Sequence, residues 1–263
     1  VGGMLLQCVF RNPLADPSVF GISSGAALGV AVVMLLLGGG FEVCGIAGMG
    51  AAVGAAFVGA MAVTALVFAL SLAVRGNVAL LVIGLMIGYL ASAFITVLNY
   101  FATADGVKSY LTWGMGSFAN VALGQLPWIA VPVAVGLAAA LFLSKSLDLM
   151  SLGENYASSL GLDTSAVRNT ALVVAGLLTA VTTAFCGPVA FVGLAVPHIT
   201  RMILRSDCHL LLLPSAMLLG AVTSMVCNVA CSLPGGGGVL PVNAVTPLVG
   251  APVVIYVIMR KKR

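Results

Sequence analysis

Few side chains in this sequence could do chemistry, and metal binding is the first chemistry that they suggest. Cys227 and Cys231 would share one face of a helix, and Cys208 stands directly beside His209. Zinc prefers thiolate and imidazole ligands, but a tetrahedral zinc site needs four converging donors. The six cysteines include no CxxC pair. We therefore expect small core cysteines and no bound metal.

Nucleotide binding and covalent catalysis have no motif in this sequence. A phosphate-binding loop has the pattern GxxxxGK[ST], in which the lysine and the following helix hold the phosphates. The run PGGGG at 234–238 lacks both features, and we interpret it as a flexible turn. We predict that the chain has no catalytic residues, is not an enzyme and binds no cofactor of its own.

The composition shows which solvent surrounds the chain. Of the 263 residues, 61% are hydrophobic and only 7% are charged, and the mean hydropathy is +1.20. A soluble domain carries about 25% charged residues. This chain is therefore expected to be an integral membrane protein that contacts the lipid bilayer and binds no nucleic acid.

The hydrophobic pattern predicts an all-α bundle of transmembrane helices. A span needs about 20 apolar residues, and backbone groups in lipid must be satisfied within helices or closed barrels. Barrel strands alternate apolar and polar residues, which the segment 51–74 does not do. Residues 1–10 are too few to span and indicate the end of a longer helix. Eight full spans are expected, at 19–38, 47–74, 78–102, 127–147, 167–186, 188–204, 210–233 and 239–259.

The basic residues predict the orientation, because they accumulate on the cytoplasmic side of a membrane. Alternating spans place ten of the eleven Lys and Arg residues on one side and only Lys108 on the other. The same alternation places Trp113 and Trp128 at the outer boundary, where indole rings are favoured. The C-terminus is therefore predicted to be cytoplasmic.

His198, in the sequence VPHITR, lies in a predicted span, where an ionisable side chain could relay protons. No acidic residue lies in the same predicted helix. We interpret His198 as the donor or acceptor of a structural hydrogen bond, with a proton relay as the alternative.

Glycines recur at four-residue intervals in three predicted spans. Such spacing lets helix backbones approach closely where no hydrophobic driving force acts between helices. It predicts tight packing and says nothing about transport. The predicted packing glycines are Gly21, Gly25, Gly29, Gly50, Gly54, Gly84 and Gly88.

Two polar segments interrupt the apolar pattern. The outer segment, 103–126, is interpreted as a short helix at the membrane surface, either a lid over a cavity or an ordinary loop. The inner segment, 151–169, contains a helix bracketed by Gly153 and Gly161, and Ala157, Ser158 and Ser159 are expected to form its exposed face. This helix is either a peg for a cytoplasmic partner or a simple connector.

Four stretches together resemble the FecCD/BtuC-type permease family of bacterial ABC importers for iron–siderophores, haem and cobalamin. They are NPLADPSVFGISSGAALG at 12–29, LGENYASSLGL at 152–162, GPVAFVGLAVPHITRMI at 187–203 and LPVNAVTPLVGAPVVIYVI at 240–258. Their order and spacing are those of the family, and between them they cover the chain.

The resemblance implies one transmembrane permease domain over 1–263, from a ten-helix subunit of the inner membrane. It would pair with a second copy and with two cytoplasmic ATPase subunits, which use the ATP. An extracytoplasmic binding protein would deliver the metal chelate. The resemblance also implies that roughly sixty residues precede this sequence, comprising one helix and most of a second, so that this chain alone would assemble poorly.

The resemblance also assigns roles to individual residues. Asn12, Pro13 and Leu14 match the turn that forms the cytoplasmic gate, and Thr103 and Ala104 match the outer gate. The segment 152–162 matches the coupling helix that docks on the ATPase. Its matching residues are Gly153, Glu154, Ala157, Ser158 and Gly161.

Some positions depart from the family. Many relatives carry charged residues where this chain has Val239, Asn228 and Ser232. Charges of this kind orient partners, so the resemblance does not determine how the binding protein docks, or which chelate is carried. The alternative function is a secondary transporter or channel without an ATPase. That reading needs intramembrane acids or broken helices, and the predicted spans hold almost no Asp or Glu.

Overall fold

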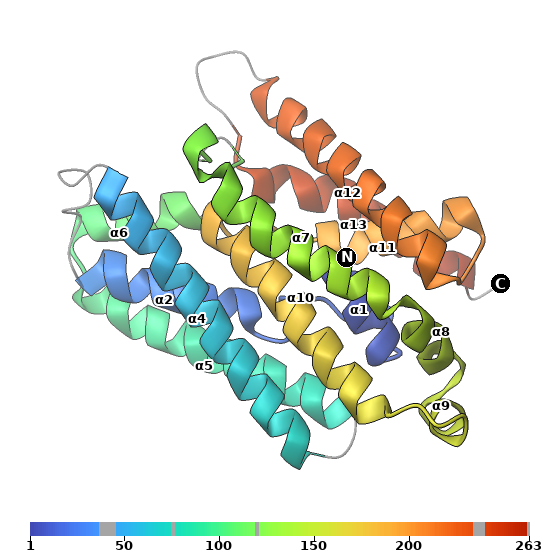
Figure 1. The fold of residues 1–263 in the computed structure, drawn as a ribbon. Coiled ribbons are helices and arrows are strands. Elements are labelled where there is room, and N and C mark those ends of the chain that lie inside the picture. The colour runs from blue at the N-terminus through green and yellow to red at the C-terminus, as the bar shows by residue number, and fades with distance from the viewer. Residues whose placement is uncertain (37–45, 75–76, 119–120, 234–239, 262–263) are drawn as a thin grey trace. The chain divides into compact units, whose positions relative to one another are not determined.

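The computed structural model describes residues 1–36, 46–74, 77–118, 121–233 and 240–261. Every regular element within these ranges is a helix, which confirms the predicted all-α class (Figure 1). Two features named above lie outside the described residues: the glycine run 234–238 and Val239.

The chain divides into two compact units. Unit 1 consists of Val1–Asp16, Ala134–Ala175 and Val189–Arg263, and unit 2 consists of Pro17–Val133 and Gly176–Pro188. The division falls within two helices, α7 (Leu126–Phe142) and α10 (Thr164–Cys186).

Unit 2 is built around α2 (Ile22–Leu36). This helix packs against α4 (Ile46–Ala73), α5 (Asn77–Phe101) and α6 (Ala104–Gly114). Figure 1 shows α2, α4 and α5 as neighbouring long rods. The side chains of α4 that are most buried are small, among them Ala52, Ala56 and Ala60. The short 3-10 helix η1 (Leu123–Gln125) leads into α7.

Unit 1 contains α1 (Gly2–Val9), whose residues from Gly3 onward are all buried. This helix packs against α8 (Ser144–Leu152) and α11 (Val192–Leu204). In turn, α11 packs against α12 (His209–Ser232) and α13 (Val242–Lys261), and α12 also contacts α8. The first residues are thus a helical segment, as predicted, and they form part of the core of unit 1.

Five described helices are long and apolar enough to cross a membrane: Gly50–Ala73, Val78–Phe101, Leu123–Phe142, Thr164–Cys186 and His209–Ser232. Two apolar helices, Ile22–Leu36 and Val192–Leu204, are shorter than expected. They begin late because Gly21 (φ +74°) and Phe191 (φ +69°) adopt the left-handed conformation, which a helix cannot include. The total of eight spans stays a prediction.

The predicted span 127–147 is two helices. The first of them, α7, ends at Phe142, and α8 begins at Ser144. Neither glycine nor proline marks the junction, so the sequence pattern predicts one continuous helix there. The Ser144 side chain is only 2% exposed and Leu147 is fully buried, so packing within unit 1 decides where the second helix begins.

Candidate functional site

The predicted coupling helix is α9 (Glu154–Ser159), and two glycines determine its ends. Gly153 has φ +130° and Gly161 has φ +85°, conformations that residues with a Cβ rarely adopt. Glu154 lies in the first turn, where the helix dipole favours an acid. Its carboxylate is 3.7 Å from the Arg168 guanidinium, but the exposure of Glu154 makes that pair a weak contribution.

The expected exposed face of α9 is wrong at one position. Ala157 is completely buried. Ser158 and Ser159 are exposed as expected. Tyr156 and Leu160 are more than half exposed. We call Tyr156, Ser158 and Leu160 the α9 surface.

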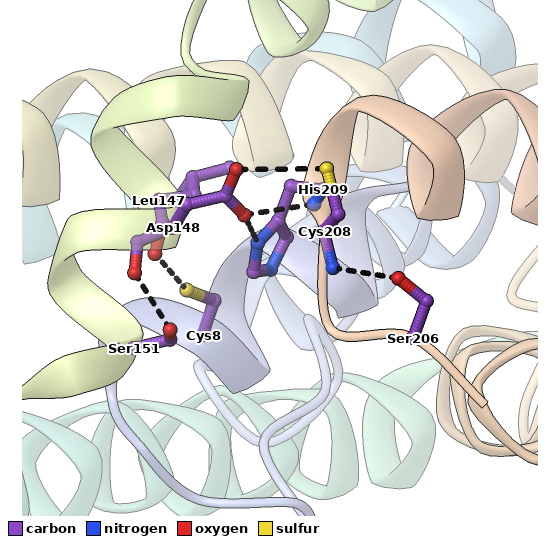
Figure 2. Close-up of polar contacts among 7 residues, drawn as sticks. All are labelled: Cys8, Leu147, Asp148, Ser151, Ser206, Cys208 and His209. Carbon is purple, nitrogen blue, oxygen red and sulfur yellow. Dashed lines mark hydrogen bonds and ion pairs between the residues drawn. The ribbon is translucent and has the colours of Figure 1, made fainter.

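Asp148, which the sequence analysis missed, links α8 to the start of α12. Its Oδ1 accepts hydrogen bonds from the backbone N–H of His209 at 2.8 Å and from the imidazole Nδ1 at 2.6 Å. Its Oδ2 lies 3.9 Å from the Cys208 thiol (Figure 2). Asp148 therefore acts as an N-cap for α12 from a distant part of the sequence. A carboxylate 61 positions before its partner carries no local signal.

The candidate metal ligands have other roles in this arrangement. Cys208 and His209 both bond to Asp148, and Cys227 and Cys231 are buried on α12. Across the described ranges, no group of three or more His, Cys, Asp or Glu residues is placed to hold a metal ion.

The predicted cytoplasmic gate is a turn that follows α1. The Asn12 side-chain oxygen accepts a hydrogen bond from the Leu14 N–H at 2.9 Å, which closes the turn. The carbonyl oxygen of Pro13 accepts one from His198 Nε2 at 2.9 Å. This bond confirms the structural interpretation of His198 and ties the turn to α11. Leu14 is 48% exposed.

Two further bonds attach α1 to its neighbours. The Arg201 guanidinium donates to Gln7 Oε1 at 2.9 Å, and the Cys8 thiol donates to the Leu147 carbonyl oxygen at 3.3 Å. With the bonds of Asp148 and His198, they join α1, α8, α11 and α12 through side chains that are buried or partly buried. Figure 2 shows the part of this network around Asp148.

The predicted outer segment does contain a short helix, α6. Thr103 is its N-cap, and the hydroxyl oxygen accepts a hydrogen bond from the Gly106 N–H at 3.3 Å. This hydroxyl is thus already used by the helix, while Ala104 is exposed. Tyr110 stacks on Trp113, and burial raises the pKa of the Tyr110 phenol. The far end of this segment is bonded to α10, from Ser117 N–H to the Cys186 carbonyl oxygen at 2.9 Å.

Most of the predicted packing glycines lie at close helix contacts. A Cβ built on Gly25 would lie 2.6 Å from the carbonyl oxygen of Gly59, and one on Gly29 would collide with the carbonyl oxygen of Ala55. One on Gly84 would lie 2.8 Å from Phe20 Cα. Gly21, just before α2, also faces Gly88 of α5.

Two predicted packing glycines make no such contact. Around Gly50 and Gly54, nothing in the described chain lies within 4 Å of an added Cβ. The four-residue spacing identifies a shared helix face, but not whether that face meets another helix. The sequence pattern also missed Gly59, whose Cβ would collide with the Gly25 carbonyl oxygen.

These observations define a multi-pass helical membrane protein whose described polar side chains form links and turns. The sequence model of the FecCD transport family matches residues 1–260. The chain belongs to that family.

Individual relatives agree with this assignment. The chain is 33% identical over 268 residues to the hemin transport system permease protein HmuU of Yersinia pestis, covering 100% of this chain and 78% of the relative. It is 33% identical over 262 residues to the vitamin B12 import system permease protein BtuC of Klebsiella pneumoniae, covering 100% and 77%.

A solved structure shares the fold. It shows a metal-chelate type ABC transporter in an inward-facing conformation. It superimposes with a TM-score of 0.87 at 30% sequence identity, over 98% of this chain and 80% of that one.

Proposed function

We propose that this chain is the transmembrane permease subunit of an ATP-binding-cassette importer for a metal chelate. With a second copy it would form the translocation pathway in the bacterial inner membrane. Two cytoplasmic ATPase subunits would hydrolyse ATP, and an extracytoplasmic binding protein would deliver haem, an iron–siderophore or cobalamin. The observation that carries this proposal is the match of the whole chain to haem and vitamin B12 permeases.

In this proposal, α9 receives the movement of the ATPase. Its exposed side chains Tyr156, Ser158 and Leu160 would contact the ATPase, and the fully buried Ala157 would seat α9 on α8. Asp148 on α8 would then carry a tilt of α9 to the start of α12. Such a hinge-type transfer needs links that hold their geometry, and the two Asp148–His209 bonds are of that kind.

The gates follow from the same proposal. The turn at Asn12–Leu14 would form the cytoplasmic constriction, because its carbonyl at Pro13 is held by His198 and its leucine is exposed. At the other end, Ala104 would narrow the pathway while Thr103 caps α6. The C-terminus would be cytoplasmic, as the distribution of basic residues predicts.

Reconstitution of the full natural permease with its ATPase and binding protein tests the proposal. We expect ATP-dependent, vanadate-sensitive uptake of a metal chelate into proteoliposomes. Purified binding protein, assayed against haem, ferric siderophores and corrinoids, would identify the cargo. Uptake driven by a proton gradient without the ATPase would contradict the proposal and favour a secondary transporter.

A pair of tryptophan variants tests the role of α9. Ser158→Trp enlarges an exposed position of the α9 surface, whereas Ser165→Trp makes the same change at an exposed position in α10. We expect Ser158→Trp to insert and dimerise normally but to lose most of the stimulation of the ATPase. Ser165→Trp should behave as the wild type. Equal stimulation in both variants would remove α9 from the docking contact.

A further inference from the structure

A pocket of about 640 Å³ opens within unit 1, between α1, the gate turn, the end of α8, α11 and the start of α12. We call it the arginine pocket. Its polar lining includes Gln7, Arg11, Arg201, Asp207 and His209.

Two buried side chains at the arginine pocket have nitrogen atoms without a partner. Gln7 is 4% exposed, and its oxygen accepts from Arg201 while its Nε2 has no hydrogen-bond partner. His209 is 3% exposed, and its Nδ1 bonds to Asp148 while its Nε2 has no partner. An unsatisfied buried polar group is costly. The unpartnered Gln7 nitrogen is an amide donor, which favours a ligand that accepts a hydrogen bond.

The charge of the arginine pocket selects the kind of ligand. Arg11 and Arg201 both line it, and neither forms an ion pair with another described residue. The one lining carboxylate is Asp207, which is exposed. The carboxylate of Asp148 is already paired with His209. Two guanidinium groups and the amide N–H of Gln7 therefore face one lining carboxylate.

These donors suit a phosphate group. Guanidinium groups bind phosphate through paired, charge-assisted hydrogen bonds. Here the donors come from α1 (Gln7), the gate turn (Arg11) and α11 (Arg201), so they approach from several sides, as a tetrahedral group requires. The volume exceeds that of an inorganic phosphate ion, and Leu14, Leu152 and Met202 supply apolar surface for an attached organic group.

We propose that the arginine pocket binds the phosphate group of a phosphate ester. Arg11 and Arg201 neutralise its charge, and Gln7 Nε2 donates a hydrogen bond to one of its oxygens. The ester is either an anionic lipid headgroup, which basic pockets between membrane helices bind on the cytoplasmic side, or a free phosphate ester. The occupant would also contact Ser151 and Leu152, the residues that lead into α9.

Binding to the full natural permease in nanodiscs tests this inference without any transport assay. One arm uses phosphatidylcholine nanodiscs and titrates glycerol 3-phosphate. The other offers mixed phosphatidylglycerol and phosphatidylcholine and identifies retained lipid by native mass spectrometry. Arg11→Gln and Arg201→Gln remove pocket charges, and Arg205→Gln removes an exposed charge that does not line the pocket.

We expect Arg201→Gln to weaken binding of the phosphate group about tenfold, Arg11→Gln to weaken it several-fold, and Arg205→Gln to leave it unchanged. Retention of phosphatidylglycerol alone would identify a lipid ligand, and binding of glycerol 3-phosphate alone a free ester. Arg11 is exposed, so its variant should fold even if Arg201→Gln does not. Equal binding by Arg11→Gln and Arg205→Gln, or no binding of either probe, would overturn the inference.

Discussion

Between α2 and α4, backbone meets backbone, at Gly25, Gly29 and Gly59. Between α1, α8, α11 and α12, buried and partly buried side chains bond to one another, as at Asp148 and His209 or Gln7 and Arg201. The first contacts belong to unit 2 and the second to unit 1. Two regions of one membrane protein thus hold their helices together by different means.

The difference follows from what each region has to bury. Lipid gives no hydrophobic drive between long apolar helices, so close van der Waals contact of small residues stabilises α2 against α4. The helices of unit 1 that carry the polar links include short ones, such as α1 and α8, which end in polar turns. In unit 1, side-chain hydrogen bonds have a fixed direction, so they determine which helix ends pack together. We infer that unit 2 resists bending while the links of unit 1 transmit displacements.

The largest expected effect is at a glycine contact. Gly59→Ala places a Cβ against the Gly25 carbonyl oxygen, so the backbones must separate. We expect the free energy of unfolding to fall by about 3 kcal/mol, as in overpacked cores. Gly54→Ala makes the same change in the same helix, where no described atom lies within 4 Å of the added Cβ. It should leave stability unchanged or raise it by up to about 1 kcal/mol, through helix propensity. If a denaturant titration showed that Gly59→Ala and Gly54→Ala lose equal free energy of unfolding, close backbone packing at Gly59 would be contradicted.

The next effect is at the polar link. Asp148→Ala leaves the His209 backbone N–H and Nδ1 without their acceptor. We expect a loss of about 2 kcal/mol in the free energy of unfolding, because both donors stay largely buried. Asp148→Asn keeps the accepting oxygen and should lose less. If the alanine variant were as stable as the wild type, the Asp148 link would not hold α8 to α12.

A smaller effect is expected from the backbone before α9. Gly153→Ala puts a Cβ on a residue with φ +130°, which should cost about 1.5 kcal/mol of local stability. Gly114→Ala, in a helical position with open space, should cost nothing. Hydrogen exchange of the α9 amides measures the difference. Unchanged α9 protection in Gly153→Ala would show that the turn tolerates a side chain.

The smallest effect is at the cap of α6 in unit 2. Thr103→Ala removes the acceptor of the Gly106 N–H and should cost about 0.5–1 kcal/mol of α6 stability. Thr103→Ser keeps the hydroxyl and should keep most of that stability. If hydrogen exchange in α6 is faster in Thr103→Ala but not in Thr103→Ser, a single side-chain hydrogen bond also stabilises a helix in unit 2.

Sequence reasoning predicted the helices well and the contacts unevenly. It predicted the short helix at 103–126 and the helix bracketed by Gly153 and Gly161, because turn glycines and changes of polarity are local signals. It took Ala157 for an exposed residue, since a small side chain looks the same on either face of a short helix. It predicted α7 and α8 as one helix, since no helix breaker lies at Leu143.

The sequence by itself determined the solvent and the class of structure. An apolar chain with few charges lies in lipid, where its backbone groups must be satisfied within helices. Hydropathy and charge are sums over single residues, so the sequence is enough to predict both the membrane location and the helical class. Only the tertiary structure decided which glycine faces meet, which side of α9 is buried, and that Asp148 caps α12. Those outcomes depend on residues far apart in the chain, and no local pattern records such distances.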